Sequence, residues 1–322
     1  MPMLENNFQE VLRDHTAGDP MRVEVKWTNL PPVEISQKLA VRGTPAGQGV
    51  VRRLLRKHGY VRRKMRKRTT MGPPQPQRNA QFENIARLKE EYLQSGDPVI
   101  SMDGKKKELL GNFYREGKLY TRETIDVFDH DFPDAGKGKV LPHGLYDVRK
   151  NTGHINLGTS HETSEFACES LEHWWRSRGC IVYPNAKRML LLCDGGGSNS
   201  ANRYVFKEEL QRLAERVGLE LRVAHYPPYC SKYNLIEHRM FPHVTRACQG
   251  VVFETIGIVK ELMERTRTAT GLSVTVDILD KAYQLGRSCS KGFKKNMKIV
   301  FDAILPKWNY RALPLAAPHA PT

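Results

Sequence analysis

Apolar residues occur along this chain in short blocks, and their spacing separates expected helices from expected strands. Helical spacing predicts helices over residues 32–40, 50–58, 79–94, 163–178, 202–217 and 232–247. Short continuous apolar runs, each bounded by a charged residue or a turn, predict strands over 99–102, 144–148, 154–157, 189–193 and 219–224. Strands therefore come first in the second part of the chain and then alternate with helices.

Turn and cap residues refine this pattern. Residues 108–115 are expected to continue the first strand as a hairpin, and 126–143, rich in Asp, His, Gly and Pro, to form an irregular insertion. Residues 149–153 predict the turn of a second hairpin. Thr163 is an expected N-cap, and Gly179 an expected helix end. The element order predicts an α/β fold in which helices flank a mixed sheet, the outline of an RNase H-like fold.

The N-terminal part combines a helix, a turn containing Gly and Pro, and a basic helix ended by Gly59. This outline fits a helix-turn-helix, and it fits an ordinary αα-hairpin equally well. Between Arg52 and Arg68 there are ten Lys or Arg residues and no acid. Such a run repels itself unless an anion neutralises it, so it favours DNA contact by Arg52, Arg53, Arg56, Lys57, Arg62, Arg63, Lys64, Arg66, Lys67 and Arg68.

Proline-rich composition marks a boundary between two domains. We expect a helix-turn-helix DNA-binding domain over residues 1–70 and a Pro-rich linker with a lead-in helix over 71–96. An RNase H-like catalytic domain is expected over 97–310, and a tail over 311–322.

Charge and cysteine usage narrow the class of protein. The net charge is +16, and residues 1–98 carry +8 of it, so the first third is the more densely charged. This favours a polyanionic partner over a merely basic protein. Six cysteines stand singly, without a CxxC pair, which predicts reduced thiols in a cytoplasmic protein rather than a zinc ribbon. Apolar runs are too short to span a membrane.

Three acidic residues carry the candidate chemistry. Asp103 and Asp194 each end an apolar strand, and Glu237 lies in an expected helix after Pro227 and Pro228. Two strand-end carboxylates and a helical Glu are suited to hold two hard divalent cations, an arrangement used for in-line displacement at phosphorus. The plainer alternatives are a strand-to-helix turn at Asp194, capped by Asn199, and an exposed helix carboxylate at Glu237.

Four motifs in order carry a family resemblance: residues 99–113, 130–134, 193–199 and 227–241. Together they resemble the ISAzo-type (Rhodopirellula-type) insertion-sequence transposases, a branch of the DDE transposases with an RNase H-like catalytic core. The resemblance implies that Asp103, Asp194 and Glu237 are the catalytic and metal-binding triad. Gly104 and Gly195 stand where the family often has Thr and Ser.

From these observations we expect a DNA transposase that cleaves and transfers strands of an insertion sequence. It would use two Mg²⁺ ions, for which Mn²⁺ can substitute, and would bind double-stranded DNA at transposon ends and target with self-association on the DNA. Lys105, Lys106, His238 and Arg239 are further expected DNA contacts. The alternative is a catalytically silent, N-terminally truncated remnant that acts as a DNA-binding protein.

Overall fold

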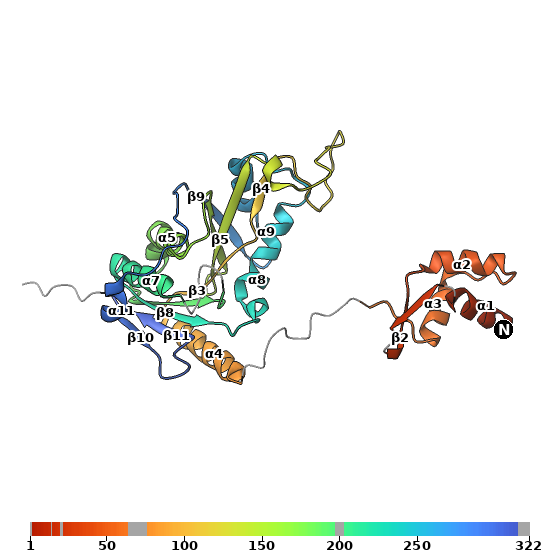
Figure 1. Ribbon diagram of the computed structural model, residues 1–322, viewed down its shortest axis with the longest axis horizontal. Coiled ribbons are helices and arrows are strands. Elements are labelled where there is room, and N and C mark those ends of the chain that lie inside the picture. The colour runs from red at the N-terminus through yellow and green to blue at the C-terminus, as the bar shows by residue number, and fades with distance from the viewer. Residues whose placement is uncertain (1, 14, 20–21, 64–75, 197–202, 315–322) are drawn as a thin grey trace, which may run out of the picture. The chain divides into compact units, whose positions relative to one another are not determined.

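The computed structural model describes residues 2–13, 15–19, 22–63, 76–196 and 203–314. Its internal contacts divide the chain into two units, Met1–Thr70 and Met71–Thr322, which are drawn in Figure 1. None of the helices in the described ranges is both long and apolar enough to cross a membrane.

The first unit is a small helical bundle with a hairpin. It contains α1 (Pro2–Arg13), β1 (Thr16–Asp19), β2 (Arg22–Thr28), α2 (Pro32–Val41) and α3 (Gln48–Lys57). The two helices expected from the sequence are confirmed as α2 and α3. Helix α1 and the hairpin were not expected. The three helices share one apolar core around Phe8, Ile35, Leu39 and Val51, so α1 supplies apolar surface that α2 and α3 bury.

The second unit is built on a nine-stranded mixed sheet, ordered β10-β11-β8-β7-β3-β5-β6-β9 with β4 paired to β5. Its strands are β3 (Val99–Gly104), β4 (Glu108–Leu110), β5 (Gly138–Asp147), β6 (Thr152–Gly158), β7 (Arg188–Cys193), β8 (Glu220–His225), β9 (Ser273–Leu279), β10 (Ile299–Phe301) and β11 (Asn309–Ala312). The first of these strands, β3, lies centrally, with β5 antiparallel on one side and β7 parallel on the other. The expected RNase H-like mixed sheet is therefore confirmed.

Helices cover both faces of this sheet. They are α4 (Arg78–Ser95), α5 (Ser164–Trp174), α6 (Cys180–Val182), α7 (Tyr204–Val217), α8 (Leu235–Arg239), α9 (Phe241–Ala247), α10 (Ile256–Glu264) and α11 (Lys291–Asn296). Because successive strand residues point to opposite faces, Met102 and Leu145 pack with α5 and α7. Tyr146 and Ile155 pack with α8, α9 and α10 on the other face.

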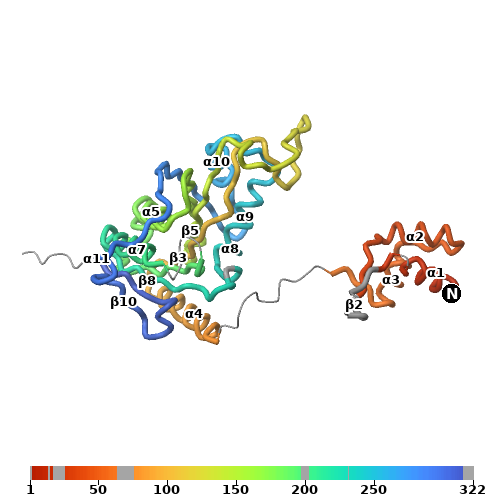
Figure 2. The backbone as a smooth tube through the Cα atoms, in the orientation of Figure 1, coloured from red at the N-terminus to blue at the C-terminus, as the bar shows by residue number. Residues whose placement is uncertain are grey.

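Helix α8 lies against β3 and β5, with α9 following it directly (Figure 2). One continuous helix over 232–247 was expected, and this was wrong. Met240 interrupts it, with φ −126° and ψ −58°, and the next helix begins at Phe241 with Pro242 in its first turn. Proline has no amide hydrogen and favours the first helical turn, so a new helix begins there.

Three other boundary predictions were wrong. The 108–115 hairpin does not form, because β4 pairs with β5 instead of β3. The irregular insertion ends at residue 137, since β5 begins at Gly138. Helix α5 is capped by Thr163 as predicted, but the helical path continues past its expected end through a π-helical turn, Trp175–Gly179, into α6.

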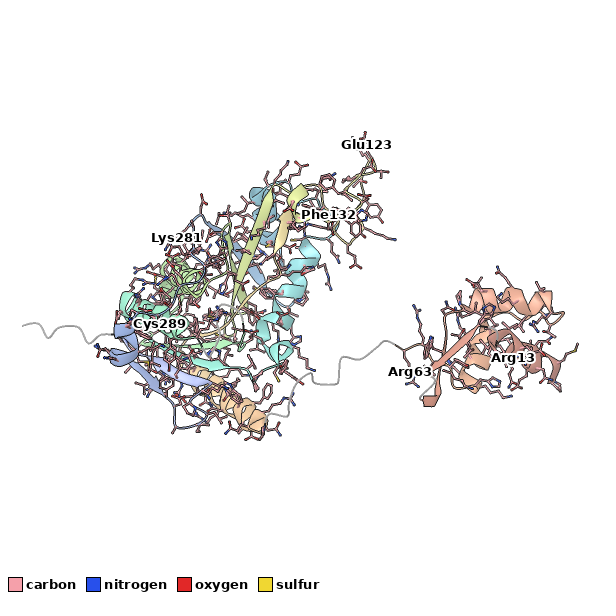
Figure 3. The ribbon with its side chains drawn as sticks, in the orientation of Figure 1. Arg13, Arg63, Glu123, Phe132, Lys281 and Cys289 are labelled. Carbon is pink, nitrogen blue, oxygen red and sulfur yellow. The ribbon has the colours of Figure 1, made fainter. Side chains whose placement is uncertain are left out.

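The segment between β4 and β5 extends away from the sheet and carries Glu123 and Phe132 (Figure 3). Strands β9, β10 and β11 were not predicted. Strand β11 pairs antiparallel with β8, and β9 pairs parallel with β6, so the C-terminal segments complete both edges of the sheet.

Candidate active site

Asp103 and Asp194 occupy corresponding positions on neighbouring strands. Met102 of β3 is paired with Cys193 of β7, and the two strands are parallel. The residue after each partner is therefore an aspartate at the same edge of the sheet. The carboxyl ends of parallel strands are where α/β proteins place their binding sites. The sequence predicted this convergence from two apolar runs that each end in Asp.

Asp103 lies in an environment that disfavours its charge. Burial raises the pKa of Asp103 to about 8, and the charges of Asp194 and Glu237 add to this effect. Two donors act in the opposite direction: the amide of Gly104 donates to Oδ1 at 2.8 Å, and Asn234 Nδ2 donates to Oδ2 at 3.4 Å. The shift shows that the three carboxyl groups lie within range of one another's charge.

The position of Asp194 is fixed through its backbone. The ring of His225 donates from Nδ1 to the Asp194 carbonyl oxygen at 2.9 Å, and its Nε2 accepts from the Tyr310 hydroxyl at 2.9 Å. Burial lowers the pKa of His225 to about 4, so the ring is neutral and suited to this pair of bonds. Burial also raises the pKa of Asp194, while the Gly196 amide opposes that rise. The residues beyond Gly196, including Asn199, lie outside the described ranges.

Asn234 joins the start of α8 to β3. Its Nδ2 donates to the Met102 carbonyl oxygen at 3.3 Å as well as to Asp103, and its Oδ1 accepts from Ser101 Oγ at 2.5 Å. Ser101 Oγ in turn accepts from the Ile236 amide at 3.0 Å. These buried bonds set the position of the helix that carries Glu237 relative to Asp103. Asn234 lies in the motif of residues 227–241, but nothing in that pattern predicted this role.

Glu237 is half-buried on α8, between Ile236 and the exposed His238. Burial raises the pKa of Glu237, and the charge of Asp194 raises it further, while His238 and Lys105 lower it. Ile236 and Met240 are fully buried, so the opposite side of the helix is fixed in the core.

Two glycines let α8 and α9 lie close to the sheet. A Cβ on Gly144, the β5 partner of Asp103, would lie 2.5 Å from Phe241 and 2.8 Å from Met240. A Cβ on Gly153 of β6 would overlap the Met240 sulfur. Glycine at these positions therefore permits the close packing that brings Glu237 toward the strand-end aspartates.

The donor set of this carboxylate cluster (Asp103, Asp194 and Glu237) fits hard divalent cations. All its side-chain ligands are oxygens, and a bound cation would offset the burial and the mutual repulsion that together raise the pKa of Asp103. Among the described residues, these three carboxylates do not form a group whose ligand atoms all lie within 4.8 Å of one another. The cluster is therefore wider than a single compact ion site.

A groove of about 490 Å³ lies beside Glu237. Its lining includes Lys105, Lys106, Arg115 and Phe241. Lys105 Nζ forms an ion pair with Glu108 at 2.5 Å, so this expected DNA contact is already paired inside the groove. Lys106, His238 and Arg239 are exposed, although His238 Nε2 also donates to the Lys232 carbonyl.

The structure describes only some of the expected DNA contacts of the first unit. Arg52, Arg53 and Arg56 are exposed on α3, whereas Lys57 pairs with Glu5 of α1 at 2.6 Å. Four further contacts lie outside the described residues: Lys64, Arg66, Lys67 and Arg68. Arg62 and Arg63 are exposed after the end of α3.

One acidic residue near the site gave no signal in the sequence. A Cβ on Gly104 would overlap the Glu162 carboxylate, so Glu162 lies directly beside the residue that follows Asp103. No apolar run or motif marks Glu162, which precedes α5, and only the folding of the chain brings it here.

Comparison with known proteins gives one family match. A family described as the Rhodopirellula transposase DDE domain matches residues 7–314. No curated protein matches the chain. Among solved structures, a pre-cleavage Mos1 transpososome is similar at 13% identity, with 80% of this chain and 69% of that chain covered and a TM-score of 0.44. A Mos1 strand transfer complex is similar at 14% identity, with 80% and 68% covered and a TM-score of 0.44.

Proposed function

The chain belongs to the Rhodopirellula transposase DDE domain family, and from that premise we propose that it is a DNA transposase that cleaves and transfers DNA strands at its carboxylate cluster. The observation that carries the proposal is the convergence of Asp103, Asp194 and Glu237 from β3, the end of β7 and α8, where burial and the neighbouring carboxylates together raise the pKa of Asp103 to about 8. Buried carboxylates that crowd one another are costly to ionise, so such a cluster favours a cation-binding role.

In this proposal Asp103, Asp194 and Glu237 would together hold two Mg²⁺ ions. The all-oxygen donor set and the width of the cluster support two hard ions rather than one. When bound there, two such ions supply activation of a water or a 3′-hydroxyl and stabilisation of the leaving 3′-oxygen.

The chain's own residues prepare this site. Without a cation, Asp103 holds a proton below about pH 8, and ion binding releases it. Asn234 donates to Oδ2 of Asp103 and to the Met102 carbonyl oxygen, and so holds the start of α8 in place relative to the Asp103 carboxyl group. Lys105, which lowers the pKa of Glu237, adds positive charge to the groove where a phosphate backbone would approach. Arg52, Arg53 and Arg56 of α3 would hold double-stranded DNA as part of a helix-turn-helix.

The test is a cleavage assay on the full chain. A labelled duplex carrying the DNA ends that flank the gene is incubated with the protein and either Mg²⁺ or Mn²⁺, and nicks are mapped by denaturing electrophoresis. We expect nicks with either ion and none with EDTA. Asp103→Asn should bind the duplex without nicking it, whereas Asp134→Asn, an exposed acid before β5, should nick as the wild type does.

The outcomes separate the enzyme from the alternative. If the wild-type chain binds the duplex but nicks it with neither ion, the catalytically silent DNA-binding protein is the better account. If Asp103→Asn nicks at the wild-type rate, the cluster is not the active site.

A further inference from the structure

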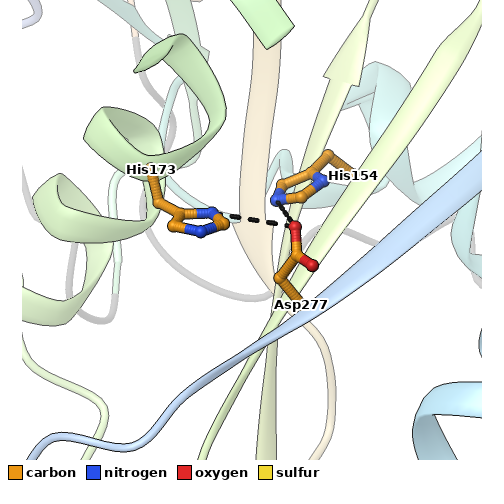
Figure 4. Close-up of side chains that lie close together, drawn as sticks. All are labelled: His154, His173 and Asp277. Carbon is orange, nitrogen blue, oxygen red and sulfur yellow. Dashed lines mark ion pairs between the residues drawn. The ribbon is translucent and has the colours of Figure 1, made fainter. Parts of the chain in front are cut away.

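A second group of ligand-type side chains lies on the other face of the sheet. His154 is on β6, Asp277 on the neighbouring strand β9, and His173 in the last turn of α5 (Figure 4). One ligand atom from each lies within 4.8 Å of the other two, and among the described residues no other group of His, Cys, Asp or Glu is that compact. We call it the histidine–aspartate cluster.

Strand pairing and helix packing bring these three residues together. Asn156 of β6 is the direct partner of Asp277 of β9, and His154 is the partner of Thr275, two residues before Asp277. Even-numbered residues of β6 point toward α5, as the bond from Asn156 Nδ2 to Ser170 Oγ shows. Asp103 instead contacts Asn234 near α8. The histidine–aspartate cluster and the carboxylate cluster are therefore on opposite faces of the sheet.

His154 is held through both ring nitrogens. Asn156 uses its Nδ2 for Ser170, so its Oδ1 accepts from His154 Nε2 at 3.2 Å. In that tautomer His154 Nδ1 accepts from Thr275 Oγ1 at 2.8 Å. Nε2 also lies 3.7 Å from the Asp277 carboxylate, so a cation bound there would replace the Nε2 hydrogen between His154 and Asp277.

A proton on His154 is a poor candidate for that cation. Burial lowers the pKa of His154 to about 4, with the nearby Arg178 adding to the effect, so the ring is neutral at pH 7. His173 supplies a second imidazole nitrogen, because its Nδ1 is a buried atom with no hydrogen-bond partner. Neutral imidazole nitrogens are the commonest metal ligands in proteins.

The distances are close to those of a metal site. His154 Nε2 lies 3.7 Å and His173 Nδ1 3.8 Å from Asp277 Oδ2. A tetrahedral ion with bonds of about 2.0–2.1 Å requires ligand separations of about 3.3–3.4 Å, so small side-chain rotations suffice. Thr275 would act as the outer partner that holds a ligating histidine in its tautomer.

Arg178 is the competing cation. Its Nη1 lies 3.6 Å from Asp277 Oδ2, and 36% of its side chain is exposed, so it can turn to solvent when an ion binds. In the plainer arrangement, Asp277 serves only as the partner of Arg178, and the two imidazole rings simply stack, with centroids 5.8 Å apart.

We propose that His154, His173 and Asp277 bind one divalent transition-metal ion of the Zn²⁺ class, with water as the fourth ligand, and so tie α5 to β6 and β9. Two imidazoles and one carboxylate select Zn²⁺ over Mg²⁺, which prefers an all-oxygen octahedral shell. The role is structural, and the proposal does not depend on strand cleavage at the carboxylate cluster.

Metal binding is measured on the full chain after EDTA treatment and desalting. The protein is dialysed against micromolar Zn²⁺ with millimolar Mg²⁺ present, and bound zinc is determined by elemental analysis. We expect one Zn²⁺ per chain in the wild type. His173→Gln and Asp277→Asn should each weaken Zn²⁺ binding by about 100-fold. Loss of a residue that only orients a ligand weakens metal binding by about 10- to 100-fold, and loss of a ligand itself should cost at least the upper end of that range. Both positions are partly exposed, so both variants should fold.

Matched controls locate the ion. Asp280→Asn, an exposed acid just after β9, and Asp103→Asn should both retain one Zn²⁺. Co²⁺ in place of Zn²⁺ should give the visible absorption of a four-coordinate site in the wild type and lose it in His173→Gln. The proposal is overturned if the wild type binds no zinc. It is equally overturned if His173→Gln and Asp277→Asn bind zinc as the wild type does, or if only Asp103→Asn loses it.

Discussion

Neutralising Asp103 should stabilise the metal-free protein, and the gain should increase with pH. The pKa of Asp103 is about 8 in the folded chain against 3.8 for an ordinary aspartate. The unfolded chain therefore ionises first, and folding must either keep a proton on this carboxyl or bury its charge. Stability is fully present below the unfolded pKa and is lost progressively as the pH rises to the folded pKa.

The structure sets the size of this effect. Across a window in which the unfolded carboxyl is ionised and the folded one is protonated, each pH unit costs about 1.36 kcal/mol. Between pH 5 and pH 7 the wild type should therefore lose about 2.7 kcal/mol that Asp103→Asn does not lose. For a unit of this size, that corresponds to a difference in melting temperature that grows by about 5–10 °C.

The assay is thermal unfolding of both proteins in EDTA at pH 5, 6, 7 and 8. Titrating groups that do not interact with Asp103 are shared by the two proteins, so they cancel in the difference between variant and wild type. Asp134→Asn, at an exposed position, should show a difference that does not change with pH. Saturating Mg²⁺ at pH 8 should raise the melting temperature of the wild type more than that of Asp103→Asn. If the difference between Asp103→Asn and wild type is the same at pH 5 and pH 7, Asp103 is not held in a charge-disfavouring cluster and the reasoning fails.

Three further predictions concern the rest of the site and the first unit. Glu237→Gln removes one carboxylate ligand, so it should reduce the nicking rate by about 100-fold or more, measured by single-turnover cleavage. Its affinity for the duplex, measured by filter binding, should stay within about twofold of the wild type. Unchanged nicking would exclude Glu237 from the cluster's chemistry. Gly144→Ala should destabilise the protein by about 1–3 kcal/mol in urea titration, because its methyl group would overlap the α8–α9 junction, whereas Gly257→Ala, with its nearest neighbour at 3.7 Å, should not. Three arginines are exposed on α3: Arg52, Arg53 and Arg56. Reversing their charge should reduce the slope of log affinity against log salt concentration for duplex binding by about 0.9 per lost phosphate contact. If the slope is no different from that of the control Arg265→Glu, α3 does not face the DNA.

Local pattern was sufficient for the elements that carry the aspartates. The apolar runs before Asp103 and Asp194 form buried strands. A buried strand appears in the sequence as a continuous apolar run, so it can be predicted without knowing which strands pair with it. Thr163 was predictable as a helix start for a similar reason, since an N-cap depends on a residue three positions away. The mixed sheet followed from the order of these elements.

Elements whose stability comes from distant partners were not predictable in this way. Strand β9 alternates polar and apolar residues instead of forming a continuous apolar run, and it pairs with β6 along its whole length. Helix α1 is held by apolar contacts with α2 and α3, and the break at Met240 is stabilised by the space that Gly144 and Gly153 leave. Tertiary contacts decide such cases because short segments gain little from local propensity alone.

The sequence by itself determined the residue types of the site and the edge of the sheet where two of them meet, because strand periodicity and parallel order fix which end of each strand is exposed. Only the tertiary structure brought Asn234 to Asp103, Glu162 beside Gly104, and His173 to Asp277. Each of these pairs joins residues far apart in the chain, and their meeting depends on how α5 and α8 pack on the sheet, which no local pattern encodes.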